Sequence, residues 1–104
     1  MMKKTLLLAA GLGLATGTAF AGNPDEAMTK AGCLACHSKD KKVVGPAFKE
    51  IAAKYKGQDV TGKLVEKVRK GGSGSFGPIP MSPNGPDKIG DADLKEVVES
   101  ILKS

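Results

Sequence analysis

Four segments of the chain have helical character: apolar side chains recur with helical spacing in the last three, and capping residues mark the first. In the second segment, Phe48, Ile51 and Tyr55 lie three or four positions apart and would share one helix face. Asn23 and Asp91 precede the first and last segments and suit the N-cap position. We expect helices from Pro24 to about Cys33, from about Ala47 to Lys56, from about Val60 to Lys70 and from about Ala92 to Lys103.

The chain lacks the strict alternation of apolar and polar residues that indicates a β-strand, so the expected fold class is all-α. Residues 71–90 are rich in glycine and proline, which suit neither helix nor strand. An irregular stretch of this length is uncommon in a compact domain and is usually either functional or disordered. Because Met81 lies within it among several prolines, we favour the functional interpretation.

The first residues have the organisation of a secretory signal peptide. A basic start is followed by an apolar run from Leu6 to Ala15, and Ala19-Phe20-Ala21 fits a cleavage site. A membrane anchor is the alternative, but the run is shorter than the roughly 20 apolar residues that a spanning helix needs. We therefore expect residues 1–21 to be removed, and residues 22–104 to form one monomeric domain that stays in the periplasm without membrane insertion.

Both cysteines and the only histidine of the chain lie in one pentapeptide, Cys33-Leu34-Ala35-Cys36-His37. C-x-x-C-H is the attachment pattern of haem c. Two thiols at this spacing can add to the two vinyl groups on one edge of a haem, and the adjacent imidazole can then reach the iron. We interpret Cys33 and Cys36 as the attachment points of a covalent haem and His37 as an axial ligand.

The pentapeptide could have three other uses. A thioredoxin-like redox pair needs strands around it, and none are predicted. A zinc site needs about four ligands, and these three residues are too close in sequence to form a tetrahedral site together. A structural disulfide stays possible in an oxidising compartment, although it would leave His37 unexplained.

A six-coordinate haem needs a second ligand, which a methionine thioether commonly supplies in cytochromes c. Met28 falls on the first predicted helix, where it suits a core position. Met81 lies in the proline-rich stretch, and prolines restrict the backbone in a way that could hold a weak ligand in place. We predict Met81 as the second axial ligand, with a gap-filling role in the core as the alternative.

The formal net charge of the chain is +5. Basic residues concentrate between Lys30 and Lys70, whereas the segment from Asp87 to Ser104 has more acids than bases. This distribution favours docking to a redox partner with an acidic surface. The lysines could equally be ordinary solvated helix faces. We expect no nucleic-acid partner, because aromatic residues do not interleave with the basic ones.

Residues 22–104 resemble the small class I cytochromes c of bacteria, of the c-551/c-552 type. The resemblance rests on Gly32-Cys33-Leu34-Ala35-Cys36-His37, Val44-Gly45-Pro46-Ala47-Phe48, Gly71-Gly72-Ser73-Gly74 and Gly77-Pro78-Ile79-Pro80-Met81-Ser82-Pro83-Asn84. It implies about four helices wrapped around one haem c. It also implies a periplasmic electron carrier that is not an enzyme, working between membrane-bound donors and a terminal oxidase or nitrite reductase.

The resemblance assigns further roles position by position. Pro46 matches a proline whose carbonyl accepts a hydrogen bond from the axial histidine. Asn84 matches an asparagine that forms a hydrogen bond with the axial sulfur. Lys67 matches a basic residue near a haem propionate. Two positions depart from the family pattern. Phe76 stands where a tryptophan is usual, and Ser100 stands where an aromatic usually packs on the first helix, so we expect a looser helix contact and lower stability.

Electron transfer by Fe(III)/Fe(II) cycling is the expected function, because Met81 would close the axial site opposite His37. A small haem enzyme or gas sensor is the first alternative and would need an open or labile sixth position. A dithiol module without haem is the second. The mass of the denatured protein separates the dithiol module from the two haem proteins, because only a haem protein would carry the added mass of a covalent haem.

Overall fold

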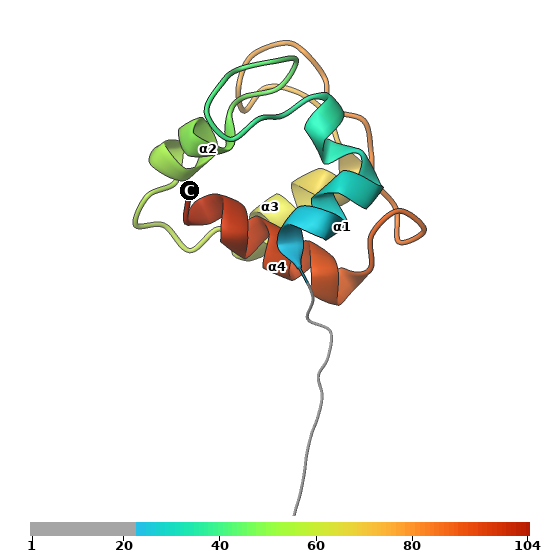
Figure 1. Ribbon diagram of the computed structural model, residues 1–104. Helices are drawn as coiled ribbons and strands as arrows, with labels where there is room; N and C mark the ends of the chain where they lie inside the picture. Colours follow the sequence, from blue (N-terminus) through green and yellow to red (C-terminus); the bar gives the residue numbers. More distant parts are fainter. Residues whose placement is uncertain (1–22) are drawn as a thin grey trace, which may run out of the picture.

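The computed structural model describes residues 23–104, which form an all-α fold as predicted. In Figure 1 the helices and the long loops between them follow one another around a ring. The predicted signal peptide, residues 1–21, lies outside the described residues. The elements are α1 (Pro24–Ala31), the 3-10 helix η1 (Cys33–Ala35), α2 (Phe48–Lys54), α3 (Thr61–Lys70) and α4 (Asp91–Leu102).

Within residues 23–104 β-pairing is limited to two isolated bridges, His37 with Lys42 and Gly72 with Met81. None of the helices in this part of the chain has the length and apolar character needed to cross a membrane. The residues between α3 and α4 are irregular, as the glycine and proline content predicted, and the bridge at Met81 is their one regular pairing.

The ends of the first helix follow from local chemistry. The Asn23 side chain accepts hydrogen bonds from the backbone N–H groups of Asp25 and Glu26, at 3.0 and 3.3 Å, which satisfies two donors of the first turn. Gly32 ends α1 with a φ of +84°, a conformation that glycine adopts without steric cost. The helix therefore ends two residues earlier than predicted, and Cys33 begins η1.

The start of α4 corrects one prediction. Asp91 is the first helical residue and not the N-cap, which is Gly90 and offers no side-chain acceptor. The Asp91 carboxylate instead pairs with the guanidinium of Arg69 on α3, at 2.5 Å. A negative charge in the first helical turn is also favourable with respect to the helix dipole.

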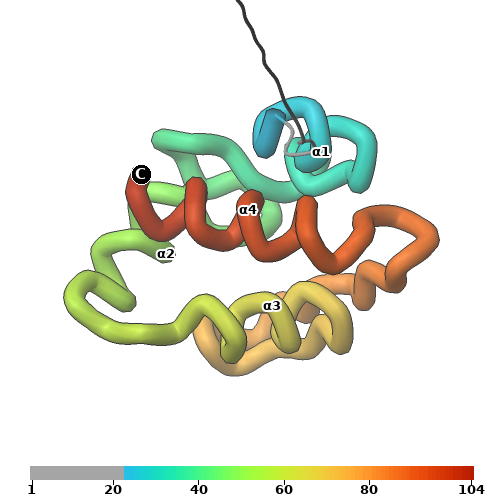
Figure 2. Tube along the Cα trace, turned by 90° about the horizontal axis from the view of Figure 1, so that it is seen from below, coloured from blue at the N-terminus to red at the C-terminus, as the bar shows by residue number. Residues whose placement is uncertain are grey.

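The core lies where α4 crosses the other three helices. Figure 2 shows α4 between α1 on one side and α3 on the other, and it also contacts α2. Its Leu94, Val97 and Val98 side chains are buried, and they cluster with Met28 of α1 and Phe48 of α2. Met28 is only 2% exposed, which confirms its predicted place in the core.

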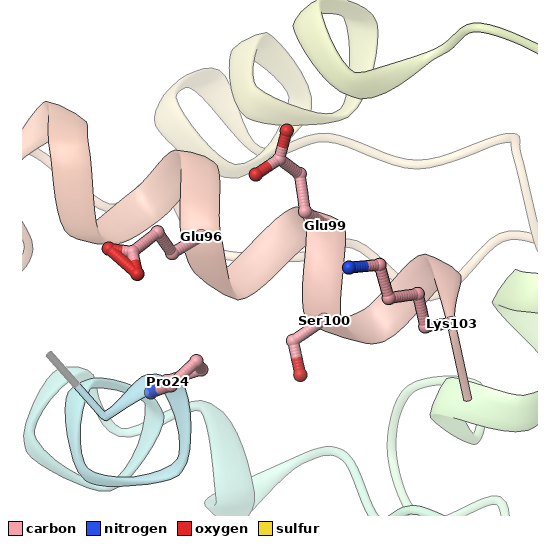
Figure 3. Close-up of a pocket in the computed structure, with 5 residues that line it drawn as sticks. All are labelled: Pro24, Glu96, Glu99, Ser100 and Lys103. Atoms are coloured by element: carbon pink, nitrogen blue, oxygen red, sulfur yellow. The ribbon is translucent and has the colours of Figure 1, made fainter. Parts of the chain in front are cut away.

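The contact between α1 and α4 leaves an open surface pocket of about 330 Å³. Figure 3 shows its lining, and the side chain of Ser100 projects from α4 on the side that faces α1. The pocket is lined by Pro24, Glu96, Glu99, Ser100 and Lys103. The short Ser100 side chain thus stands beside unfilled space at the position where the resemblance predicted a missing aromatic.

Replacing Ser100 with phenylalanine should raise the free energy of unfolding by about 1 kcal/mol, the usual gain when a surface gap is filled with apolar volume. Denaturant unfolding followed by circular dichroism would measure the change. Lys95→Phe is the matched control, because Lys95 is exposed on the same helix. Equal effects of the two variants would mean that the pocket does not limit stability.

Candidate haem site

The two cysteines lie on one tight turn. After Gly32, residues Cys33–Ala35 form a single 3-10 turn, and the backbone N–H groups of Cys36 and His37 both donate to the Cys33 carbonyl, at 3.2 and 3.0 Å. Both cysteines are free thiols, Cys36 exposed and Cys33 half-buried. Burial raises the pKa of the Cys33 thiol, and a backbone hydrogen bond partly opposes this shift.

The imidazole of His37 is held by one hydrogen bond and one ring contact. Its Nδ1 lies 2.7 Å from the carbonyl oxygen of Pro46. Because a carbonyl only accepts, Nδ1 carries the proton and donates, which leaves the Nε2 lone pair for a metal. The Phe48 ring stacks against the imidazole, with centroids 5.4 Å apart and planes inclined by 23°. Pro46 is therefore positioned as the resemblance implied.

Gly45 is a site residue that sequence reasoning recognised only as part of a motif. A Cβ atom at this position would lie 2.5 Å from His37 Cε1, well inside contact distance. Its backbone N–H also donates to the Cys36 carbonyl at 2.7 Å. Any side chain at position 45 would displace the His37 imidazole. A glycine here therefore allows the backbone at this position to pass close to the imidazole ring.

Met81 is attached to the C-terminal end of α3 through its backbone. Met81 and Gly72 exchange two hydrogen bonds, each 2.9 Å long. Gly71, which ends α3, has a φ of +71° and a ψ of −155°, a conformation that is essentially restricted to glycine. A Cβ atom on Gly71 would lie 2.3 Å from the Met81 carbonyl oxygen, so the two backbones touch.

Asn84 and Lys67 lie on either side of this attachment. The Asn84 amide nitrogen donates to the carbonyls of Val68 and Ser82, at 3.3 and 3.0 Å. Lys67 Nζ lies 3.5 Å from the Ser73 carbonyl, over the glycine-rich run. The structure therefore brings both residues to the methionine loop, and their predicted bonds to sulfur and propionate stay predictions.

Phe76 occupies the position where a tryptophan was expected. Its ring packs edge-on to Tyr55, with centroids 6.4 Å apart, and the ammonium of Lys54 lies 4.5 Å from the ring centroid. Lys54 also donates to the Ser75 carbonyl. A cation over an aromatic face is attracted to it, so Phe76 keeps the loop attached to α2 without an indole N–H.

Among residues 23–104, five large apolar side chains are between 36% and 55% exposed: Leu34, Val43, Val44, Phe76 and Ile79. One lies in the cysteine motif, two lie in the loop that follows it (residues 38–47), and two lie in the loop that precedes Met81 (residues 73–80). Exposed apolar side chains in the segments that carry the candidate ligands indicate surface that could bind an apolar group. Together with the thiol pair and the free Nε2, they fit a covalently attached haem.

The comparisons with known proteins agree with this geometry. The cytochrome c family model matches residues 25–104. Cytochrome c2 of Rubrivivax gelatinosus is 51% identical over 78% of this chain and 96% of its own length. Cytochrome c-551 of Pseudomonas aeruginosa is 47% identical over 92% and 89% of the two chains. The crystal structure of Nitrosomonas europaea cytochrome c552 superimposes with a TM-score of 0.69 at 44% identity, covering 76% and 96%.

The fold and the site define a small all-α haem protein, and the match over residues 25–104 identifies its family. The chain belongs to the cytochrome c family, and its relatives place it among the small class I proteins of the c-551/c-552 type. It is therefore a mono-haem electron carrier with one covalently attached haem c, and it works with redox partners.

Proposed function

We propose that this chain carries single electrons in the periplasm with His37 and Met81 as the axial ligands of a haem held by Cys33 and Cys36. The bound haem supplies an iron that cycles between Fe(III) and Fe(II). The observation that carries the proposal is the fixed imidazole: the Pro46 carbonyl, 2.7 Å from Nδ1, holds the ring and leaves the Nε2 lone pair available to ligate the iron of a bound haem. A hydrogen bond of this kind also makes the imidazole a more basic ligand.

The thioether of Met81 is the proposed second ligand, and its backbone attachment to Gly72 supports this role. A thioether is a weak donor that favours the ferrous state and so raises the reduction potential. The amide of Asn84 is proposed to bond the Met81 sulfur in place of one of its two carbonyl partners, and the ammonium of Lys67 to lie near a haem propionate. With both axial positions taken by side chains, no substrate binds at the iron and the protein is not an enzyme.

Two measurements on the exported protein test the proposal. Denaturing mass spectrometry should give the mass of the chain from Gly22 plus one haem, which also tests removal of residues 1–21. The mass of the bare polypeptide would overturn the attachment at Cys33 and Cys36. The ferric spectrum should contain a sulfur-to-iron charge-transfer band, whereas a five-coordinate high-spin spectrum would favour the enzyme or gas sensor.

The partners are proposed to be redox proteins with acidic docking surfaces, such as a terminal oxidase or a nitrite reductase. Lys41 and Lys42 are exposed and immediately precede the exposed Val43 and Val44. A basic rim beside apolar contacts favours brief encounters, because long-range attraction speeds association while a small interface allows rapid release. The monomeric state belongs to the same proposal.

Replacing both Lys41 and Lys42 with glutamate should slow electron transfer to an acidic partner about tenfold at low salt, with the difference shrinking as ionic strength rises. Stopped-flow rates over a range of salt concentrations would measure this. The double variant Lys88→Glu and Lys95→Glu makes the same change in net charge near the acidic C-terminal helix. If both double variants slow electron transfer equally, the rate depends on the net charge of the protein and not on docking at Lys41 and Lys42.

A further inference from the structure

The segment that follows Met81 is attached to α3 through the side chain of Arg69. The guanidinium donates from Nη1 to the carbonyls of Asn84 and Ile89, at 3.2 and 2.8 Å. Its Nη2 pairs with the Asp91 carboxylate at 2.5 Å. The Arg69 side chain is only 18% exposed, so its bonds to the two carbonyls form largely away from water. The Asp91 side chain is 93% exposed, so the ion pair faces solvent.

Asn84 is fixed on both of its backbone groups. Its N–H donates to the Val68 carbonyl at 3.0 Å, and its carbonyl accepts from Arg69. Val68 and Arg69 are neighbours in the last turn of α3, where helix carbonyls lack partners within the helix. Two adjacent helix residues thus hold one loop residue through a donor and an acceptor.

Met81 itself is fixed by the paired hydrogen bonds to Gly72. The stretch 81–84 is therefore attached at its first residue to Gly72, two residues past the end of α3, and at its last residue to α3 itself. Holding both ends of so short a stretch limits how far the Met81 backbone can move, and therefore limits the positions from which its side chain could reach the iron of a bound haem. Arg69 supplies the one attachment that comes from a side chain of α3.

We propose that Arg69 is a positioning residue for the axial ligand, setting how often Met81 leaves the iron. The inference rests on the proposed ligation by Met81. Arg69 touches neither ligand and acts through the Asn84 and Ile89 carbonyls. The planar guanidinium can donate hydrogen bonds to two carbonyls from one nitrogen and to a carboxylate from the other. The single ammonium of a lysine does not reproduce this arrangement.

The test is the binding of imidazole to the ferric holoprotein, measured by stopped flow. An added ligand can bind the iron only after Met81 has dissociated. Its observed binding rate therefore levels off at high ligand concentration, at the rate of Met81 dissociation. Arg69→Met keeps the apolar stem and removes the donors, and we expect it to raise this limiting rate about tenfold. The limiting rate of Arg69→Lys should lie between those of the parent protein and Arg69→Met.

Two control variants separate positioning from general stability. Asp91→Asn removes the ion-pair charge but leaves both carbonyl bonds of Arg69, so the limiting rate should stay within about twofold of the parent protein, since an exposed ion pair contributes little. Val97→Ala creates a gap in the buried core, which should lower the denaturant midpoint and leave the limiting rate unchanged.

A limiting rate in Arg69→Met equal to that of the parent protein would overturn the proposal. So would a rise that Val97→Ala reproduces at equal loss of stability, because Arg69 would then serve only the overall fold. The ligation proposal fails in a different way: the parent ferric protein would lack the charge-transfer band, and its imidazole binding rate would not level off.

Discussion

Replacing Met81 with alanine should lower the reduction potential of the protein by on the order of 0.2 V, a fraction of the range of about 0.8 V that axial ligands span. The thioether stabilises ferrous iron, and the water or hydroxide that would replace it favours the ferric state. The sulfur-to-iron charge-transfer band should disappear in the same variant. Spectroelectrochemical titration measures the potential, and the ferric absorption spectrum reports the ligand.

Met28→Ala is the matched control, because it removes the other methionine thioether of residues 23–104. Met28 is buried between α1 and α4, so its truncation should cost about 2–5 kcal/mol of stability while the potential and the charge-transfer band persist. If Met81→Ala leaves the potential and the ferric spectrum unchanged, Met81 is not the ligand, and the enzyme or gas sensor becomes the better interpretation.

A glycine-to-alanine change at Gly71 should destabilise the protein by about 3–5 kcal/mol. The conformation at φ +71° and ψ −155° costs a residue with a side chain about 1–3 kcal/mol. The new Cβ atom would also lie 2.3 Å from the Met81 carbonyl oxygen. This backbone must then move, which breaks the paired hydrogen bonds between Gly72 and Met81, each worth about 1 kcal/mol. Denaturant unfolding measures the loss.

Two other glycines separate the causes of that loss. Gly57 also has a positive φ, +76°, but a Cβ atom there meets nothing within 4 Å, so Gly57→Ala should cost only about 1–2 kcal/mol of strain. Gly62 lies inside α3, where alanine should stabilise the helix by about 0.5–1 kcal/mol. A cost at Gly71 no larger than that at Gly57 would mean that the contact with Met81 is unimportant.

The helices were predictable because their causes are local. Apolar spacing located three of them and capping residues located the first, and the ends differ from prediction by no more than two residues. The prediction that failed concerned Asp91, which looked like an N-cap but lies within the helix. Its carboxylate pairs with Arg69, which is 22 positions away in the chain. A cap preference is a weak local energy, and a tertiary partner decides what the side chain does.

The candidate site divides in the same way. The cysteine motif was readable because three reactive side chains within five residues can act on one cofactor without help from the rest of the fold. Gly45 and Gly71 have roles that depend on the backbone and side chains that come near them. No pattern in the sequence states that a Cβ at Gly45 would meet His37, because the loop between them must first fold back.

By itself, the sequence determined the chemistry available to this protein: helices with one apolar face each, a thiol pair for haem, one imidazole and a methionine among prolines. The tertiary structure decided how those groups are held. It brought the Pro46 carbonyl within hydrogen-bond distance of His37, and it attached the two ends of the segment 81–84 to Gly72 just past α3 and to Arg69 within α3. Helix formation and motif spacing depend on near neighbours, whereas ligand positioning depends on contacts that exist only when distant segments meet.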